Sequence, residues 1–306
     1  MIFTTGVFFL LYDGVLMKIL MFGMHKGGTG KTLLSRLASE YFPKKGFRTL
    51  GIDLDNQCNY SRRFLNMDID HDSAEGILPP IHPDYDPKDI DDSNWDGRSS
   101  IADIFFNEPV LPYKSKINNL DICPGHPTKL LDAERVRKHE EHLIYDKLKE
   151  FLHLPELQKT YDLVIIDTPP SRGPLTIAAL KAATHLVIPS LMETQSIEGL
   201  YGMMQLFKIE NLNREQKSQL VLIGIQPNQF RGQTKQHKEI FNGLKKSKQL
   251  SKYLMATPIG MRSIFSEVDQ SGATPPSVFD APKTNKAQVE ATKLCKHIEK
   301  RIFVHG

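Results

Sequence analysis

The chain has 306 residues, of which 40% are hydrophobic and 25% are charged, and its formal net charge is +3. This composition is typical of a soluble globular protein and excludes a disordered or fibrous chain. The three cysteines, Cys58, Cys123 and Cys295, are scattered without a C-x-x-C pair. The sequence therefore predicts neither a disulfide framework nor a zinc site, and a reducing, cytosolic compartment is expected by default.

Residues 1–16 are apolar but have no basic region before the apolar run, and Asp13 and Gly14 interrupt them. This stretch is too short to span a bilayer. Met17 then begins a typical first strand. We interpret residues 1–16 as an upstream extension from a mis-assigned start, with an extra packed element or a weak membrane-touching segment as the alternatives.

From residue 17 to residue 303, short apolar runs alternate with helical patterns, which is typical of βαβ units around a mostly parallel sheet. The predicted strands are 18–24, 48–54, 120–124, 161–167, 185–189, 220–225 and 254–258. The predicted helices are 33–42, 129–153, 173–183, 196–209, 234–246 and 286–303. These patterns predict a single doubly wound α/β domain, with helices on both faces of the sheet.

Residues 66–97 break this rhythm, because they contain four prolines and ten acidic residues against one lysine, Lys88. A loop of this length is uncommon inside a compact domain. We predict an acidic surface insertion here. Either it is a solvated loop without a role of its own, or it is a contact surface for a basic partner.

The segment from His25 to Thr32, H-K-G-G-T-G-K-T, lies between the first predicted strand and the first predicted helix. Strand, glycine-rich loop and helix together are the context of a phosphate-binding loop, whose backbone N–H groups surround the phosphates. Lys31 is predicted to reach the β- and γ-phosphates of a nucleotide, and Thr32 to ligate Mg²⁺. The predicted nucleotide-binding residues in this loop are Gly27, Gly28, Thr29, Gly30, Lys31 and Thr32.

Acidic residues follow two of the predicted strands. Asp53 and Asp55 end the strand 48–54, and Asp167 ends the strand 161–167. Ligands of open α/β sheets bind beyond the carboxyl ends of the strands, and carboxylate oxygens suit Mg²⁺. The sequence therefore predicts that these carboxylates lie beside the phosphate-binding loop.

The loop departs from the strict pattern G-x-x-x-x-G-K-[ST], because His25 stands at the first glycine. It fits K-G-G-x-G-K-[ST] instead, with an additional lysine, Lys26. In this respect it resembles the deviant Walker A loop of the ParA/MinD superfamily of ATPases. The resemblance implies a nucleotide sandwich dimer in which Lys26 reaches the partner's ATP, so that Lys26, Lys31 and Asp55 are the predicted catalytic residues.

Two further segments carry the same resemblance. I-D-L-D-N-Q at 52–57 is similar to the family's D-x-D-P-Q-G-N, and D-T-P-P-S at 167–171 matches its Walker B segment. The resemblance implies that Asp55 positions the attacking water and that Asp167, with Asp53, holds the metal region. Asn56 and Cys58 replace the usual proline and glycine. Relatives hold adenine with an asparagine after the strand that 220–225 resembles, and Asn228 is the candidate here.

Seven basic residues and one acidic residue, Glu239, lie between residues 231 and 252. Such a run is either a solvated helix face or a surface that binds DNA phosphates. ParA proteins bind DNA non-specifically with basic residues of this region, so the resemblance implies DNA contacts by Arg231, Lys235 and Lys238.

The leading functional prediction is a ParA-type partition ATPase that uses ATP and Mg²⁺, dimerises on ATP and binds non-specific DNA. The resemblance implies weak hydrolysis that a ParB-like partner stimulates, and a cytoplasmic, nucleoid-associated protein. The alternative is a MinD-like membrane-cycling ATPase. That reading requires a basic amphipathic helix after the last core helix, where only F-V-H-G remains, so no stable membrane association is expected.

Overall fold

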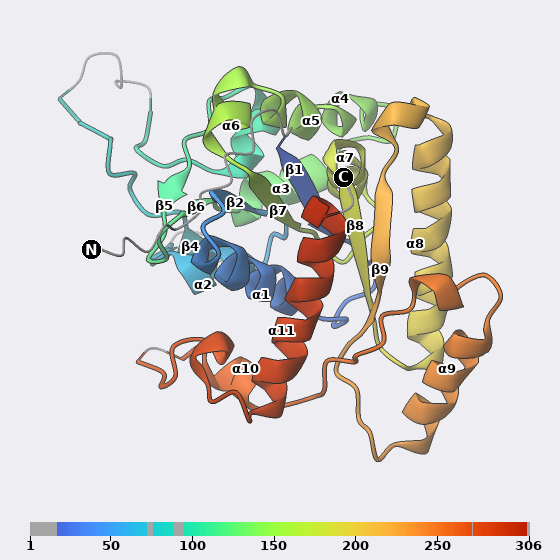
Figure 1. Ribbon diagram of the computed structural model, residues 1–306. Coiled ribbons are helices and arrows are strands. Elements are labelled where there is room, and N and C mark those ends of the chain that lie inside the picture. The colour runs from blue at the N-terminus through green and yellow to red at the C-terminus, as the bar shows by residue number, and fades with distance from the viewer. Residues whose placement is uncertain (1–16, 72–75, 89–94, 271, 305–306) are drawn as a thin grey trace, which may run out of the picture.

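The computed structural model describes residues 17–71, 76–88, 95–270 and 272–304, which fold around one central sheet of seven strands (Figure 1). The strand order across this sheet is β5-β6-β2-β7-β1-β8-β9. Its strands are β1 (Lys18–Phe22), β2 (Thr49–Asp53), β5 (Tyr113–Lys114), β6 (Leu120–Cys123), β7 (Leu163–Asp167), β8 (His185–Ser190) and β9 (Val221–Pro227). The predicted residues 1–16 extension lies outside the described residues.

Every neighbouring pair in this sheet is parallel except β5 and β6, which are antiparallel. In the register of β1, β7 and β2, Phe22 lies opposite Asp167, and Asp167 lies opposite Asp53. Three adjacent strands therefore end at the same level, at the carboxyl edge where open α/β sheets bind ligands. The predicted α/β class with a mostly parallel sheet is confirmed.

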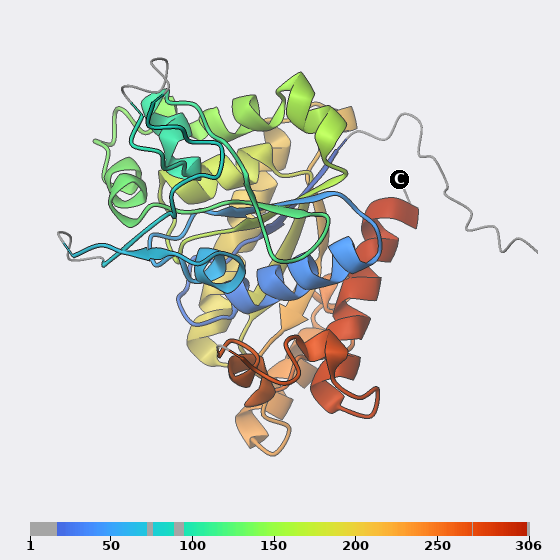
Figure 2. The ribbon, with the colours of Figure 1, turned by 90° about the vertical axis from the view of Figure 1, so that its left-hand side faces the viewer.

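Helices cover both faces of the sheet (Figures 1 and 2). On one face, α1 packs beside α11, and on the other lie α3, α4, α5, α7, α8 and α9. The α-helices are α1 (Lys31–Lys44), α2 (Asn59–Phe64), α3 (Pro127–Glu134), α4 (His142–Tyr145), α5 (Lys147–Leu152), α6 (Pro155–Thr160), α7 (Pro174–Ala182), α8 (Thr194–Leu212), α9 (Lys235–Lys246), α10 (Ile264–Glu267) and α11 (Lys286–Glu299). The 3₁₀ turns are η1 (Ile101–Phe106), η2 (Gln216–Ser218), η3 (Ser251–Tyr253) and η4 (Val278–Asp280), and a π-helical turn, η5 (Lys300–Val304), follows α11.

The strands supply side chains to a separate hydrophobic core on each face. In β1, Ile19 and Met21 pack with the helices α3 to α9, whereas Leu20 and Phe22 pack with α1 and α11. This alternation follows from the two-residue repeat of a strand. Because both faces are covered, the central strands are continuous apolar runs, which is how the sequence revealed them.

Three secondary-structure predictions need correction. The predicted helix 129–153 is three shorter helices, α3, α4 and α5. The predicted strand 254–258 is absent as a strand, and Leu254 makes only one parallel bridge, to Ile225. Helix α1 continues through Pro43 and ends at Lys44, two residues past the predicted end at residue 42.

Part of the acidic insertion, residues 72–75 and 89–94, lies outside the described residues. Its described part contains a short antiparallel pair, β3 (Asp68–Ile69) with β4 (Ile77–Leu78). Arg98 bridges Asp68 at 2.7 Å, which ties this pair to the segment before η1. The insertion is therefore anchored to the domain at its base.

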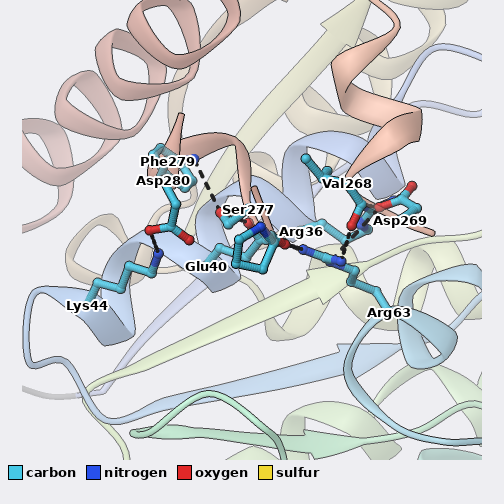
Figure 3. A network of polar contacts seen from close by, with 10 residues as sticks. Arg36, Glu40, Lys44, Arg63, Val268, Asp269, Ser277, Phe279 and Asp280 are labelled. Atoms are coloured by element: carbon cyan, nitrogen blue, oxygen red, sulfur yellow. Dashed lines mark hydrogen bonds and ion pairs between the residues drawn. The ribbon is translucent and has the colours of Figure 1, made fainter. Parts of the chain in front are cut away.

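A buried polar network fixes α1 and α2 to the segment 268–280 (Figure 3). The Arg63 guanidinium donates to Glu40 Oε1 at 2.7–2.8 Å and to the Val268 carbonyl at 2.6 Å. Glu40 Oε2 accepts from the Ser277 hydroxyl, and Arg36 binds both oxygens of Asp269. Helix α1 follows the phosphate-binding loop, and α2 follows the Asp53–Asp55 segment. This network therefore fixes the helix that comes after each of these two segments.

Candidate functional site

The loop between β1 and α1 has the backbone of a phosphate-binding loop. Gly28 and Gly30 have φ angles of +72° and +87°, in the left-handed region that favours glycine. Gly30 is the N-cap of α1, and no side chain caps this helix. The first N–H groups of α1 are thus left for a ligand, as at an anion-binding helix N-terminus.

Two residues that follow β9 donate hydrogen bonds to the backbone of this loop. The Asn228 side-chain amide donates to the Thr29 carbonyl at 2.8 Å, and Gln229 donates to the Gly28 carbonyl at 2.9 Å. A Cβ atom on Gly30 would overlap the Asn228 amide nitrogen, so this position requires glycine twice over. Asn228 is fully buried, and its Oδ1 has no hydrogen-bond partner among the described residues. The structure therefore gives Asn228 a bracing contact, and its contact with adenine stays a prediction.

Lys31 lies inside the loop with a side chain that is 5% exposed. Its ammonium donates to the Lys26 carbonyl at 3.3 Å. Burial lowers the pKa of Lys31, while the negative charges of Asp167 and Asp55 oppose that shift. The lysine and both carboxylates therefore lie close enough for their charges to interact.

Asp167 ends β7 and is fully buried. Its Oδ1 accepts from the Ser35 hydroxyl at 2.9 Å, whereas Oδ2 has no hydrogen-bond partner in the described part of the chain. Burial raises the pKa of Asp167, and the Thr32 hydroxyl holds it lower. A buried carboxylate oxygen without a partner is rare and marks a place where a cation or a water completes the contacts.

Asp53 reaches the same region, but both of its oxygens are engaged. Oδ2 accepts from the Ser61 backbone N–H at 2.8 Å and from the Ser61 hydroxyl at 2.7 Å, and Oδ1 accepts from the Asp55 N–H at 3.1 Å. Burial and the neighbouring Asp167 raise the pKa of Asp53. Asp53 thus fixes the start of the following loop at Asp55 and ties it to Ser61 on α2.

Asp55 is partly exposed and turns back on its own loop, where Oδ1 accepts from the Gln57 N–H at 3.0 Å. Burial raises the pKa of Asp55, and the Lys31 ammonium lowers it. Its second oxygen, Oδ2, takes no part in the hydrogen bonds that fix this loop. Asp55 is therefore a carboxylate near Lys31 whose Oδ2 accepts no hydrogen bond from the described residues.

The residues present fit a Mg²⁺–nucleotide. Among the described residues, no group of three or more histidine, cysteine, aspartate or glutamate side chains could hold a metal alone. Mg²⁺ commonly takes one or two protein oxygens and completes its shell with phosphates and water. The Thr32 hydroxyl and the unpartnered Asp167 Oδ2 are oxygen ligands of that kind, beside open helix N–H groups for phosphate.

The additional lysine, Lys26, is half-buried and contacts the start of α8. Its ammonium donates to Gln195 Oε1 at 2.9 Å, near the start of α8. The neighbouring His25 contacts Arg172 at 2.8 Å between Nε2 and the guanidinium. A Cβ atom on Gly202 would overlap that guanidinium, so α8 approaches the loop closely at a glycine.

The sequence analysis did not identify the residues that form hydrogen bonds to the predicted site residues and hold them in place. Ser35, Ser61, Gln195 and Gln229 each hold a site residue or the loop backbone. Ser35 could have been found, since it lies one helical turn after Lys31 on a predicted helix. Gln195 and Gln229 had no signal, because their partners lie far away in the sequence, and no pattern indicated the contact of Ser61 with Asp53, eight residues before it.

The basic stretch is only partly helical. Arg231 lies before α9, while Lys235 and Lys238 are exposed on α9, whose buried side carries His237 and Phe241. Lys235 faces Glu239 at 3.7 Å with both side chains exposed. A shallow hollow of about 670 Å³ lies between α8 and the segment after α9. Its lining includes Lys208, Lys248 and Lys252, together with Tyr201 and Tyr253.

A parallel sheet, a glycine loop at its central strand and acidic residues at the neighbouring strand ends define a P-loop nucleoside triphosphatase. A family model described as an AAA domain matches residues 17–222. The chain belongs to this family and, with its deviant loop, to the ParA/MinD superfamily of ATPases.

The chain is similar to several curated proteins along most of its length. It is 27% identical over 285 residues to an uncharacterized protein of Methanocaldococcus jannaschii, covering 92% of this chain and 98% of that protein. It is 28% identical to a virulence plasmid ParA family protein of Chlamydia psittaci, with 94% and 96% covered. Its identity to the chromosome-partitioning ATPase Soj of Thermus thermophilus is 27%, with 68% of each chain covered.

Solved structures share the fold. Apo McdA of Cyanothece has a TM-score of 0.68 at 18% identity, with 92% of this chain and 99% of that chain covered. Cobyrinic acid a,c-diamide synthase of Mycobacterium smegmatis, with a bound ATP analogue and magnesium, has a TM-score of 0.65 at 19% identity, with 93% and 95% covered. In the described part of our chain, no helix combines the length and the apolarity that a membrane crossing requires.

Proposed function

We propose that this chain is a ParA-like partition ATPase that binds ATP and Mg²⁺ between the phosphate-binding loop and the strand ends. The observation that supports it best is the meeting of Lys31, Thr32, Asp55 and Asp167, which come from three separate segments. Fully buried and partly buried acids beside a buried lysine cost stability, so their convergence favours a functional pocket over a structural one.

Each predicted residue has a role in this proposal. The amides of Gly27 to Gly30 hold the phosphates, and Lys31 contacts the β- and γ-phosphates. Thr32 and Asp167 hold Mg²⁺, with Asp53 fixing the loop behind them. Asp55 orients the attacking water, and Asn228 supports the nucleotide from the far side of the loop.

The proposed active form is a nucleotide sandwich dimer. Lys26 leaves Gln195 and reaches the ATP of the partner, where a cation supplied in trans is worth roughly 10³–10⁵ in rate. The ATP dimer then binds DNA non-specifically through Arg231, Lys235 and Lys238. A ParB-like partner stimulates a weak hydrolysis and releases the dimer from nucleoid DNA. The similarity to Soj and to a plasmid ParA family protein supports this cycle.

A DNA-binding titration with ATP, with ADP and without nucleotide, at several salt concentrations, tests the proposal. We expect tight binding with ATP only, and a log–log salt slope of about −0.9 per phosphate neutralised. Arg231→Glu should weaken DNA binding without changing ATP affinity. Lys217→Glu, the same charge change on the exposed η2 turn, is the matched control. Equal DNA retention with and without ATP would contradict the cycle.

A further inference from the structure

The loop from Thr168 to Gly173, which connects β7 to α7, lies against the phosphate-binding loop. The Thr168 hydroxyl donates to the Phe22 carbonyl at 2.8 Å, at the end of β1. Pro170 Cβ lies 3.8 Å from the position that a Cβ atom on Gly27 would take. One side of the 168–173 loop therefore packs on the nucleotide site, directly after Asp167.

The other side of the 168–173 loop is held by one carboxylate, Glu134 at the end of α3. Glu134 Oε1 accepts from the Ser171 hydroxyl, and Oε2 accepts from the Leu175 N–H at 3.3 Å. The Ser171 oxygen in turn accepts from the Gly173 N–H at 3.1 Å. A single side chain from another helix thus fixes both the loop and the first turn of α7.

Gly173 is shaped for this contact. A Cβ atom at this position would overlap Glu134 Oε1 and its carboxyl carbon. The φ angle of Gly173 is −76°, which alanine adopts without strain. Glycine is therefore not required here by the backbone conformation. It is required because Glu134 lies so close.

The charge of Glu134 has no cationic partner among the described residues. Burial raises the pKa of Glu134, and the acidic neighbours Glu141 and Asp55 raise it further. The groups that oppose this shift are the Ser171 hydroxyl and the Leu175 N–H, both donors of the segment that it holds. The N-terminal end of α7 also favours a negative charge. A carboxylate in this position is costly unless the segment 171–175 stays in place.

We propose that Glu134 is a positioning residue for ATP hydrolysis, which keeps the 168–173 loop pressed against the phosphate-binding loop. It touches neither nucleotide nor metal. It sets where the backbone after Asp167 lies relative to the γ-phosphate position. This inference rests on the proposed ATPase function and adds to it a residue that the sequence patterns did not indicate.

Steady-state ATP hydrolysis by Glu134→Ala tests the proposal. Because a displacement of about 1 Å can cost 10²-fold in rate, we expect kcat to fall by roughly 10²-fold while KM for ATP changes little. Glu134→Gln keeps one acceptor oxygen, so its kcat should lie between that of the wild type and that of Glu134→Ala. Glu141→Gln removes a neighbouring charge just before α4, where the carboxylate accepts from the Tyr145 hydroxyl, and this variant should hydrolyse ATP like the wild type.

A double-mutant cycle separates positioning from general destabilisation. Gly173→Ala alone should lower kcat, since its methyl group collides with Glu134. In a Glu134→Ala background the collision is gone, so Gly173→Ala should cause no further loss. Additive losses, or a KM that rises in parallel with the fall in kcat, would overturn the inference.

The two proposals fail differently. If the wild-type chain hydrolyses ATP and Glu134→Ala matches its kcat, only the role of Glu134 is overturned. If the wild-type chain neither binds nor hydrolyses ATP, the proposed function fails first and the inference fails with it. Thermal unfolding of each variant shows that the proteins compared are folded, and Glu134→Gln replaces Glu134→Ala if the latter is not.

Discussion

Asp53 and Asp167 lie opposite each other at the ends of β2 and β7, and both carboxyl groups are fully buried. Within the part of the chain that the structure describes, only one of the two has an oxygen without a hydrogen-bond partner, Asp167 Oδ2. The side chain of Asp53 accepts hydrogen bonds from Asp55 in the loop that follows it and from Ser61 on α2. Two acids that look alike in the sequence therefore have different tasks, one holding a loop and one open to a ligand.

This pair predicts how stability depends on pH without nucleotide. Burial raises the pKa of both acids, so the folded chain binds protons that the unfolded chain has released. Their contribution to the free energy of unfolding is present below about pH 4 and is lost as pH rises through about 6 for Asp167 and about 8 for Asp53. Asp53→Asn should flatten this slope. Chemical denaturation at several pH values measures it, and an unchanged slope in the variant would contradict the assignment.

Lys31→Ala should remove the main cation from the phosphate site. A charge-assisted contact of about 2–3 kcal/mol corresponds to roughly 10²-fold weaker ATP binding. Isothermal titration calorimetry measures the change. Lys45→Ala, an exposed lysine just beyond the end of α1, is the control. Retained ATP affinity in Lys31→Ala would place the nucleotide elsewhere.

Asp55→Ala should leave ATP binding intact and slow hydrolysis by roughly 10²–10⁴-fold, the usual contribution of a positioned proton acceptor. The variant should then accumulate as the ATP-bound dimer, which size-exclusion chromatography with ATP detects. Turnover at the wild-type rate would remove Asp55 from the mechanism.

Asn228→Ala should loosen the phosphate-binding loop, because the buried Thr29 carbonyl loses its donor. An unsatisfied buried group costs about 1–3 kcal/mol, which we expect in thermal unfolding and as weaker nucleotide binding. Gln229→Ala removes a similar bond at an exposed position and should cost less. If both variants lose the same stability and nucleotide affinity, the burial of Asn228 does not explain the importance of its hydrogen bond to the loop.

Glu40→Ala should destabilise the fold by about 3 kcal/mol or more, because the largely buried Arg63 guanidinium loses its nearest carboxylate. Lys44→Ala removes the neighbouring exposed pair with Asp280 and should cost less than about 1 kcal/mol. Urea denaturation compares the two. Similar costs would mean that the network of Figure 3 contributes no more than a surface ion pair.

The sequence predicted the parts of this molecule that depend on local pattern. Buried strands such as β1 and β7 are continuous apolar runs, and the glycine loop is defined by adjacent residues. What it could not predict depends on distant partners. Glu134 and Asn228 act on segments 37 and 199 residues away, and no local pattern indicates such contacts. The predicted strand 254–258 failed for a similar reason, since only Leu254 finds a pairing partner there.

The bracing of an early loop by late residues has a consequence for biosynthesis. The phosphate-binding loop leaves the ribosome first, but Asn228 and Ser277 follow only after most of the chain has been made. Because these residues secure the loop and the helix behind it, the nascent chain cannot complete its nucleotide pocket during most of translation. Ribosome-bound intermediates should therefore not retain ATP until the last third of the chain has emerged.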